Sequence, residues 1–181
     1  MTGWSIAAPV ALAALVVAAG ITDLRSRRIP NWLSLAGLLA GLALGLMTGG
    51  IAGAGRACLG MGLAFLIYFP LYLVRGMGAG DVKLMAAVGA LAGPSNWLII
   101  FFFTVVVAAV FTVVAVILRG WLGKTLRNTG WLIWELAHLR PPYLRHEELD
   151  VRSERAFRLP HGAFVTLGAL LFLILRFGRP L

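Results

Sequence analysis

The chain has 181 residues and a net charge of +9, and 60% of its residues are hydrophobic while only 13% are charged. A chain this short cannot bury so much apolar surface in a water-soluble core, because a domain of this size leaves much of its surface exposed. The composition excludes a soluble enzyme and a disordered chain, and it predicts an all-α polytopic membrane protein. A basic surplus is typical of the cytoplasmic loops of such proteins, so we expect no nucleic-acid partner.

Uncharged stretches predict the membrane spans. Residues 1–22 carry no charge and are followed by a cluster of one acidic and three basic residues, which indicates a first transmembrane helix rather than a cleaved signal peptide. Residues 29–55 form the second predicted span, which starts at Pro30 and the capping amide of Asn31 and ends in a run of glycines. Residues 57–74 form the third.

Residues 84–118 are uncharged throughout and are too long for one helix that crosses a core of about 30 Å. The turn Gly93-Pro94-Ser95-Asn96 divides them into a fourth and a fifth span, and residues 159–175 form the sixth. Between the fifth and sixth spans, residues 120–140 predict one or two amphipathic helices at the membrane interface. Residues 141–158 predict a solvated loop. The whole chain, 1–181, is therefore expected to be a single transmembrane domain with one polar segment at about 119–158.

The basic residues predict the orientation. With the N-terminus outside the cytoplasm, the loops after the first, third and fifth helices hold every Lys and Arg except Arg56, Arg176 and Arg179. Both termini are therefore expected outside the cytoplasm. Anionic lipid headgroups are expected partners of Arg25, Arg27 and Arg28.

Small residues in the second and third predicted spans indicate packing rather than chemistry. Glycines recur at four-residue spacing from Gly37 to Gly53, a stripe that allows another helix backbone to approach closely. Cys58 is the single cysteine. It excludes a disulfide within the chain, and we expect it to be a small buried hydrophobic residue.

Two aspartates are the candidate catalytic residues. Asp23 ends the first predicted helix and Asp81 begins the fourth, so the proposed topology places both at a similar depth on the cytoplasmic side. Ionisable groups at such a depth are functional candidates by default. The alternative is an aspartate that only reaches toward the headgroups beside a cluster of packing glycines.

The sequence Gly76-Met77-Gly78-Ala79-Gly80-Asp81-Val82-Lys83 predicts irregular backbone before the helix. Such backbone is tolerated at membrane depth where it is buried or lines a wet cavity. Gly78 and Gly80 would leave room for an extended substrate, and Lys83 is a candidate substrate contact. Two adjacent carboxylates can share one proton, so that one activates water while the other protonates a carbonyl oxygen. This chemistry needs neither a metal nor a cofactor.

The run Gly78-Ala79-Gly80-Asp81-Val82-Lys83-Leu84 resembles the Gly-x-Gly-Asp motif of intramembrane aspartyl proteases, in particular the type IV prepilin peptidase family. The run from Asp23 to Asn31 is similar to that family's first aspartate motif, and Pro160-His161-Gly162 is similar to its final-helix Pro-x-Gly motif. His161 departs from the aromatic residue often found there, and we assign it no catalytic role.

The resemblance implies that Asp23 and Asp81 are the catalytic pair of a bacterial inner-membrane enzyme. It implies cleavage of a basic leader from prepilin-like precursors, which carry a hydrophobic helix after the leader, on the cytoplasmic side. The loop also holds four acidic residues that are expected to form a solvated face, with contact to a basic substrate leader as the alternative: Glu147, Glu148, Asp150 and Glu154. Longer family members carry paired Cys-x-x-Cys motifs associated with N-methylation. The single cysteine predicts the peptidase-only form of tight-adherence or Flp pilus systems, without methyltransferase activity.

Three alternatives stay open from the sequence. A presenilin-like or preflagellin-type protease would use the same chemistry on another substrate. A small transporter or channel would use Asp23 and Asp81 as proton or cation sites. A non-enzymatic assembly subunit of a pilus or secretion system would tolerate Asp-to-Asn changes.

Overall fold

The computed structural model describes residues 6–138 and 160–178, and within these residues every regular element is a helix. The helices are α1 (Ala7–Ser26), α2 (Asn31–Leu73), α3 (Ala79–Leu118), α4 (Leu122–Ala137) and α5 (His161–Phe177). The predicted all-α class is confirmed. By length and hydropathy α1, α2 and α3 could each cross a membrane, while α5 is a shorter apolar helix.

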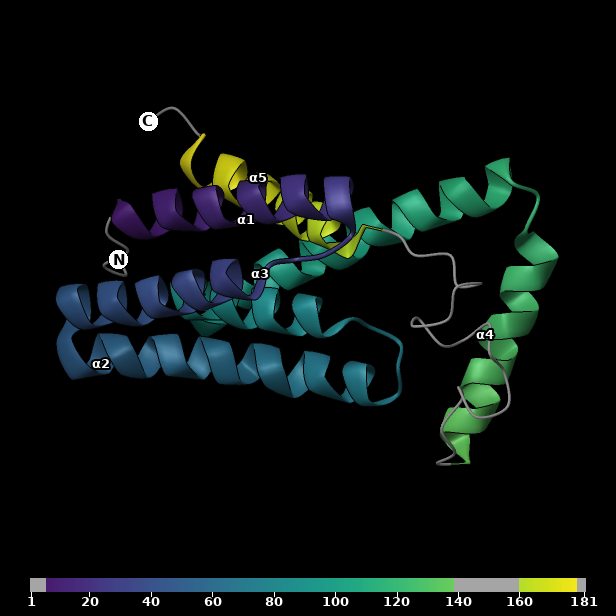
Figure 1. Cartoon of the computed structure of the whole chain (residues 1–181), viewed down its shortest axis with the longest axis horizontal. Helices are drawn as coiled ribbons and strands as arrows, with labels where there is room; N and C mark the ends of the chain where they lie inside the picture. The colour runs from purple at the N-terminus through teal and green to yellow at the C-terminus, as the bar shows by residue number, and fades with distance from the viewer. Residues whose placement is uncertain (1–5, 139–159, 179–181) are drawn as a thin grey trace.

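Glycines divide the two longest helices into antiparallel arms. Gly50 interrupts α2 with φ 57° and ψ −145°, and Gly93 interrupts α3 with φ 72° and ψ 168°. Positive φ angles cost glycine little because it has no Cβ. Each break reverses the chain, so that α2 is a helical hairpin and the second arm of α3 runs back beside α5 (Figure 1). The predicted break at Gly93–Asn96 is confirmed, and the earlier break lies at the second glycine of the predicted run.

Several predicted boundaries differ from the structure. The break at Gly50 is sharp, so Gly53, Gly55 and Arg56 lie inside the next helical arm rather than in a connection. Helix α3 begins at Ala79, which places Gly80 in its first turn, and its N-cap Gly78 is extended. Asn31 does not cap α2, because Pro30 occupies the N-cap and no side chain bonds there.

The glycine stripe of α2 packs as predicted. A Cβ added to Gly41 would meet the backbone of Ala90, and one added to Gly45 would meet the backbone of Gly53. The same close approach joins Gly60 and Gly89. Cys58, by contrast, is exposed on the outside of the bundle, so its predicted burial is wrong. This surface is apolar, and in a membrane it would face lipid.

The first arm of α3 forms the centre of the bundle, since residues 84–92 are all buried. Trp97, at the start of the second arm, is fully buried and its Nε1 donates to the carbonyl oxygen of Met85 at 3.1 Å. This hydrogen bond ties the two arms of α3 together across the Gly93 break. Asp81 therefore lies just before the buried residues of this first arm.

Helix α4 runs across the direction of the other helices, beyond the end of the second α3 arm (Figure 1). Its exposed surface combines Trp131, Trp134 and Leu126 with basic side chains, and the Arg127 guanidinium lies 5.1 Å from the Trp131 ring centroid. The predicted amphipathic segment is thus one helix. The predicted loop 141–158, with its acidic residues, lies outside the described residues.

Candidate active site

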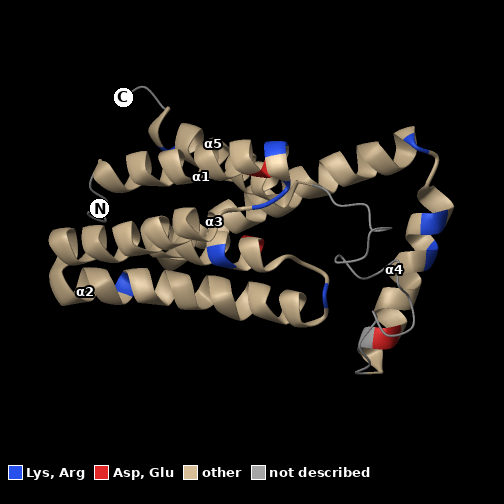
Figure 2. Cartoon of the chain, viewed as in Figure 1, with Lys and Arg blue, Asp and Glu red and all other residues tan. Residues whose placement is uncertain are grey.

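The ends of three helices bring the two predicted aspartates to the same end of the bundle. Helix α1 ends just after Asp23, α3 begins just before Asp81, and α5 begins beside them. Figure 2 shows the acidic positions of α1 and α3 at this shared end. The structure thus brings together two carboxyl groups that lie far apart in the sequence.

Asp23 caps the last helix. Its side chain is 7% exposed, and its Oδ2 accepts a hydrogen bond from the backbone N–H of Gly162 at 2.8 Å. The Ala163 N–H donates instead to the Pro160 carbonyl oxygen at 3.2 Å. Helix α5 has Pro160 at its N-cap and no capping side chain of its own, so Asp23 supplies the acceptor that its first N–H groups need.

Gly162 is required by this close approach. A Cβ at position 162 would lie 3.0 Å from both the Cβ and the Oδ2 of Asp23. A larger residue would therefore push the carboxylate away from the helix terminus. This contact gives a physical reason for the glycine in the Pro160-His161-Gly162 segment at the start of α5.

Asp81 lies in the first turn of α3, and its N–H donates to the Gly78 carbonyl oxygen at 3.2 Å. Its carboxylate lies over Gly78, where an added Cβ would be 3.2 Å from Oδ2. Gly80 faces the connection between α1 and α2, and an added Cβ there would be 3.4 Å from the Ile29 Cβ. The start of α3 therefore packs against the connection that follows α1.

Lys83 points to the start of α2, where its Nζ donates to the Asn31 Oδ1 at 3.0 Å. On the other side of the pair, the charge of Arg27 acts on Asp23. Among the residues that the structure describes, no three His, Cys, Asp or Glu side chains gather in a metal-binding arrangement.

Tyr68 and His161 were not predicted as site residues, yet both lie at this end. Tyr68 is 1% exposed, the charge of Asp81 acts on it, and its ring centroid is 5.9 Å from that of His161. The buried Nε2 of His161 has no hydrogen-bond partner among the described residues. The sequence offered one signal for Tyr68, because a polar phenol within an uncharged span is a candidate for a specific contact.

The sequence matches the type IV leader peptidase family over residues 10–113, a range that contains both aspartates. The chain belongs to the type IV leader peptidase family. It is 32% identical over 148 residues to the prepilin leader peptidase/N-methyltransferase of Aeromonas salmonicida strain A449, covering 73% of this chain and 50% of the relative. The corresponding Aeromonas hydrophila protein is 31% identical over 148 residues, covering 73% of this chain and 51% of the relative.

This leader peptidase family member thus spans about half the length of the curated relatives that it matches. No solved structure gives a significant match. The family match agrees with the resemblance carried by the two aspartate motifs, and it ends before the Pro160–Gly162 segment that contacts Asp23.

Proposed function

We propose that the chain is a membrane-embedded aspartyl endopeptidase that removes the basic leader from prepilin-like precursors at the cytoplasmic face of the bacterial inner membrane. The observation that carries the proposal is the position of Asp23 and Asp81 at the same end of an apolar helical bundle, at the end of α1 and the start of α3. Membership of the leader peptidase family supports this substrate class.

The two aspartates have different surroundings, which supports different roles. Asp23 accepts the Gly162 N–H at the positive end of α5, and this position stabilises a negative charge on its carboxylate. Asp81 lies in the first turn of its own helix α3, over Gly78, and among the described residues no N–H group of another helix donates to its carboxylate. Asp23 is therefore the base that receives a proton from water, and Asp81 is the acid that donates to the substrate carbonyl oxygen.

The reaction balances with these two groups alone. The hydroxide left when Asp23 takes a proton from water bonds to the carbonyl carbon, while Asp81 protonates the carbonyl oxygen. The resulting gem-diol then collapses. Asp23 gives its proton to the leaving amine as the C–N bond breaks, and Asp81 recovers a proton from a diol hydroxyl. This sequence leaves both carboxyl groups in their starting state.

The topology proposed for this enzyme has six membrane crossings in one domain, 1–181. The crossings are α1, the two arms of α2, the two arms of α3, and α5, with α4 in the cytoplasmic interface. The aspartates then lie on the side that holds most basic residues, and both termini lie outside the cytoplasm. Arg25, Arg27 and Arg28 lie where anionic headgroups can reach them.

Gly78, Gly80 and Lys83 are the proposed substrate-binding residues. The glycines leave the approach to Asp81 free of side chains, while Lys83 and its partner Asn31 stand at the edge of the same site. If Lys83 contacts substrate, Lys83→Met should raise KM severalfold and change kcat little. A severalfold loss of kcat at unchanged KM would show that Lys83 does not bind the substrate.

The deciding experiment is cleavage of a prepilin-like precursor in membranes that contain the wild type, Asp23→Asn or Asp81→Asn. Each change should lower the cleavage rate about 1,000-fold or more, while the variant stays folded in the membrane. Glu135→Gln on α4 is the matched control for loss of one carboxylate. Normal maturation by either Asp variant would favour an assembly subunit, and ion flux in proteoliposomes without cleavage would favour a transporter.

The assignment of roles has its own test. In the infrared spectrum of the resting protein, the protonated carboxyl band should disappear in Asp81→Asn and remain in Asp23→Asn. Loss of the band in Asp23→Asn alone would reverse the two roles.

A further inference from the structure

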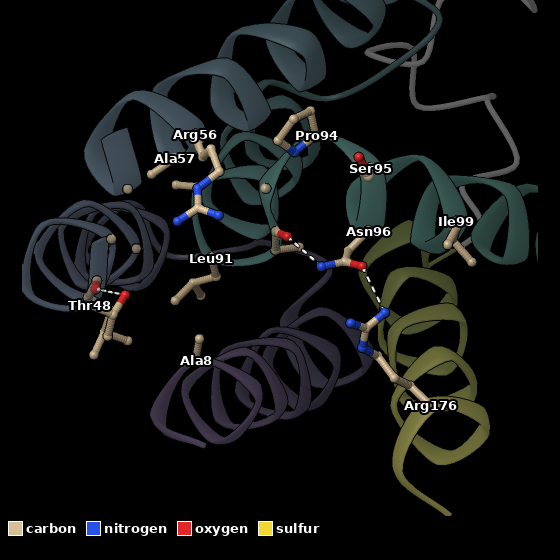
Figure 3. A pocket seen from close by; sticks show the side chains of 17 residues that line it. Ala8, Thr48, Arg56, Ala57, Leu91, Pro94, Ser95, Asn96, Ile99 and Arg176 are labelled. Atoms are coloured by element: carbon tan, nitrogen blue, oxygen red, sulfur yellow. Dashed lines mark hydrogen bonds between the residues drawn. The ribbon is translucent and has the colours of Figure 1, made fainter. Parts of the chain in front are cut away.

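A cavity lies at the end of the bundle opposite the aspartates. It is about 410 Å³ in volume and is lined by the start of α1, both arms of α2, the Gly93 break of α3 and the end of α5 (Figure 3). Helix α1 contributes Ala8, whereas Asp23 lies at its other end, and α5 contributes Arg176, whereas Gly162 lies at its other end. The cavity is therefore separate from the proposed catalytic site.

Two arginines from different helices point into this cavity (Figure 3). The Arg56 guanidinium lies over Gly49, where an added Cβ would be only 2.8 Å from its Nη2. On the other side, Arg176 Nη1 donates to Asn96 Oδ1 at 3.2 Å. Asn96 in turn donates from its Nδ2 to the Ala92 carbonyl oxygen at 2.9 Å, next to the Gly93 break. The break thus positions the amide that orients Arg176.

The lining combines these two cations with small and aliphatic residues and the polar side chains of Thr48, Ser95 and Asn96, and none of the described residues that line it is acidic. Guanidinium groups present several N–H donors in a planar fork that matches phosphate oxygens. The volume lies within the range of about 300–1,000 Å³ that is usual for sites of small ligands. A phosphate between Arg56 and Arg176 would receive hydrogen bonds from two directions.

We propose that this cavity binds the phosphate group of an anionic ligand, held between Arg56 and Arg176. Under the proposed topology the cavity lies at the depth of the outer-leaflet headgroups, so a lipid such as phosphatidylglycerol can reach it from the bilayer. A soluble phosphate ester can reach it from the aqueous side. The proposal does not depend on the peptidase assignment, because none of the lining residues takes part in that chemistry.

The test is native mass spectrometry and thermal unfolding of the full chain in a neutral detergent. Three probes separate the sources: phosphatidylglycerol, diacylglycerol with the same acyl chains, and glycerol phosphate. Variants Arg56→Gln, Arg176→Gln and the double change remove the cations. Arg75→Gln, between α2 and α3, is the control for an equal loss of charge at the opposite end of the bundle.

Phosphatidylglycerol should bind to the wild type and raise its melting temperature, and diacylglycerol should do neither. Each single change should weaken binding about tenfold or more, and the double change should abolish the thermal shift, while Arg75→Gln behaves as wild type. An equal shift with glycerol phosphate would identify a soluble phosphate as the source. Equal binding by the wild type and the double variant, or no binding of any phosphate-bearing probe, would overturn the proposal.

Discussion

The backbone N–H of Gly162 donates to the Asp23 carboxylate at 2.8 Å and so joins the first and last helices of the chain. This hydrogen bond fixes the position of one proposed catalytic group through the backbone of a helix that carries neither aspartate. The start of α5 therefore becomes part of the site, although it contributes no acidic side chain.

Gly162→Ala should displace the Asp23 carboxylate, because the new Cβ would lie 3.0 Å from its Oδ2. We expect the rate of leader cleavage to fall about tenfold or more, as when a catalytic group is moved by a fraction of an ångström to an ångström. Gly55→Ala is the matched control, since a Cβ there meets nothing within 4 Å. Equal rates for the two variants in a membrane cleavage assay would contradict this positioning role.

Asp23→Ala and Asp23→Asn should differ in stability, because only one of them removes the acceptor for the Gly162 N–H. Both remove the carboxylate, but the Asn side-chain oxygen can still accept from Gly162. Asp23→Ala should therefore lower the free energy of unfolding by about 1–2 kcal/mol through the lost cap, while Asp23→Asn changes it less. Thermal unfolding in detergent measures the difference. If Asn destabilises the protein as much as Ala, the contribution of the cap is smaller than inferred.

Gly60→Ala should destabilise the bundle, because the added Cβ would meet the carbonyl group of Gly89 in the neighbouring helix. Overpacking of this kind costs about 1–3 kcal/mol. Gly62→Ala, two residues along the same arm, adds its Cβ to open space and should leave the melting temperature unchanged or slightly raised. A similar loss of stability in both variants would indicate an effect of helix composition instead.

His161→Phe should keep the ring beside Tyr68 and remove a buried nitrogen that has no hydrogen-bond partner among the described residues. We expect the thermal stability to stay level or rise, since an unsatisfied buried polar atom costs about 1–3 kcal/mol. His161→Ala, which also removes the ring, should lower the stability. A marked loss of stability in His161→Phe would show that the imidazole has a polar partner in the membrane.

Hydropathy and charge predicted where the helices lie along the chain and at which end of them the two aspartates lie. Uncharged stretches located the helices, the Gly93-Pro94 turn located the α3 break, and the positions of Asp23 and Asp81 at helix ends indicated that they share one side. These properties follow from the order of residues in the sequence. In a helix that crosses a bilayer, the position of a residue along the helix determines its depth in the membrane.

Lateral contacts were decided only by the tertiary structure. The hydrogen bond of Gly162 to Asp23, the contact of Tyr68 with His161, and the cavity between Arg56 and Arg176 all join helices that are distant in the sequence. Hydropathy carries no information on which helix faces lie together. That choice depends on where the small residues of α2 and α3 allow two backbones to approach, and hence on the packing of the whole bundle.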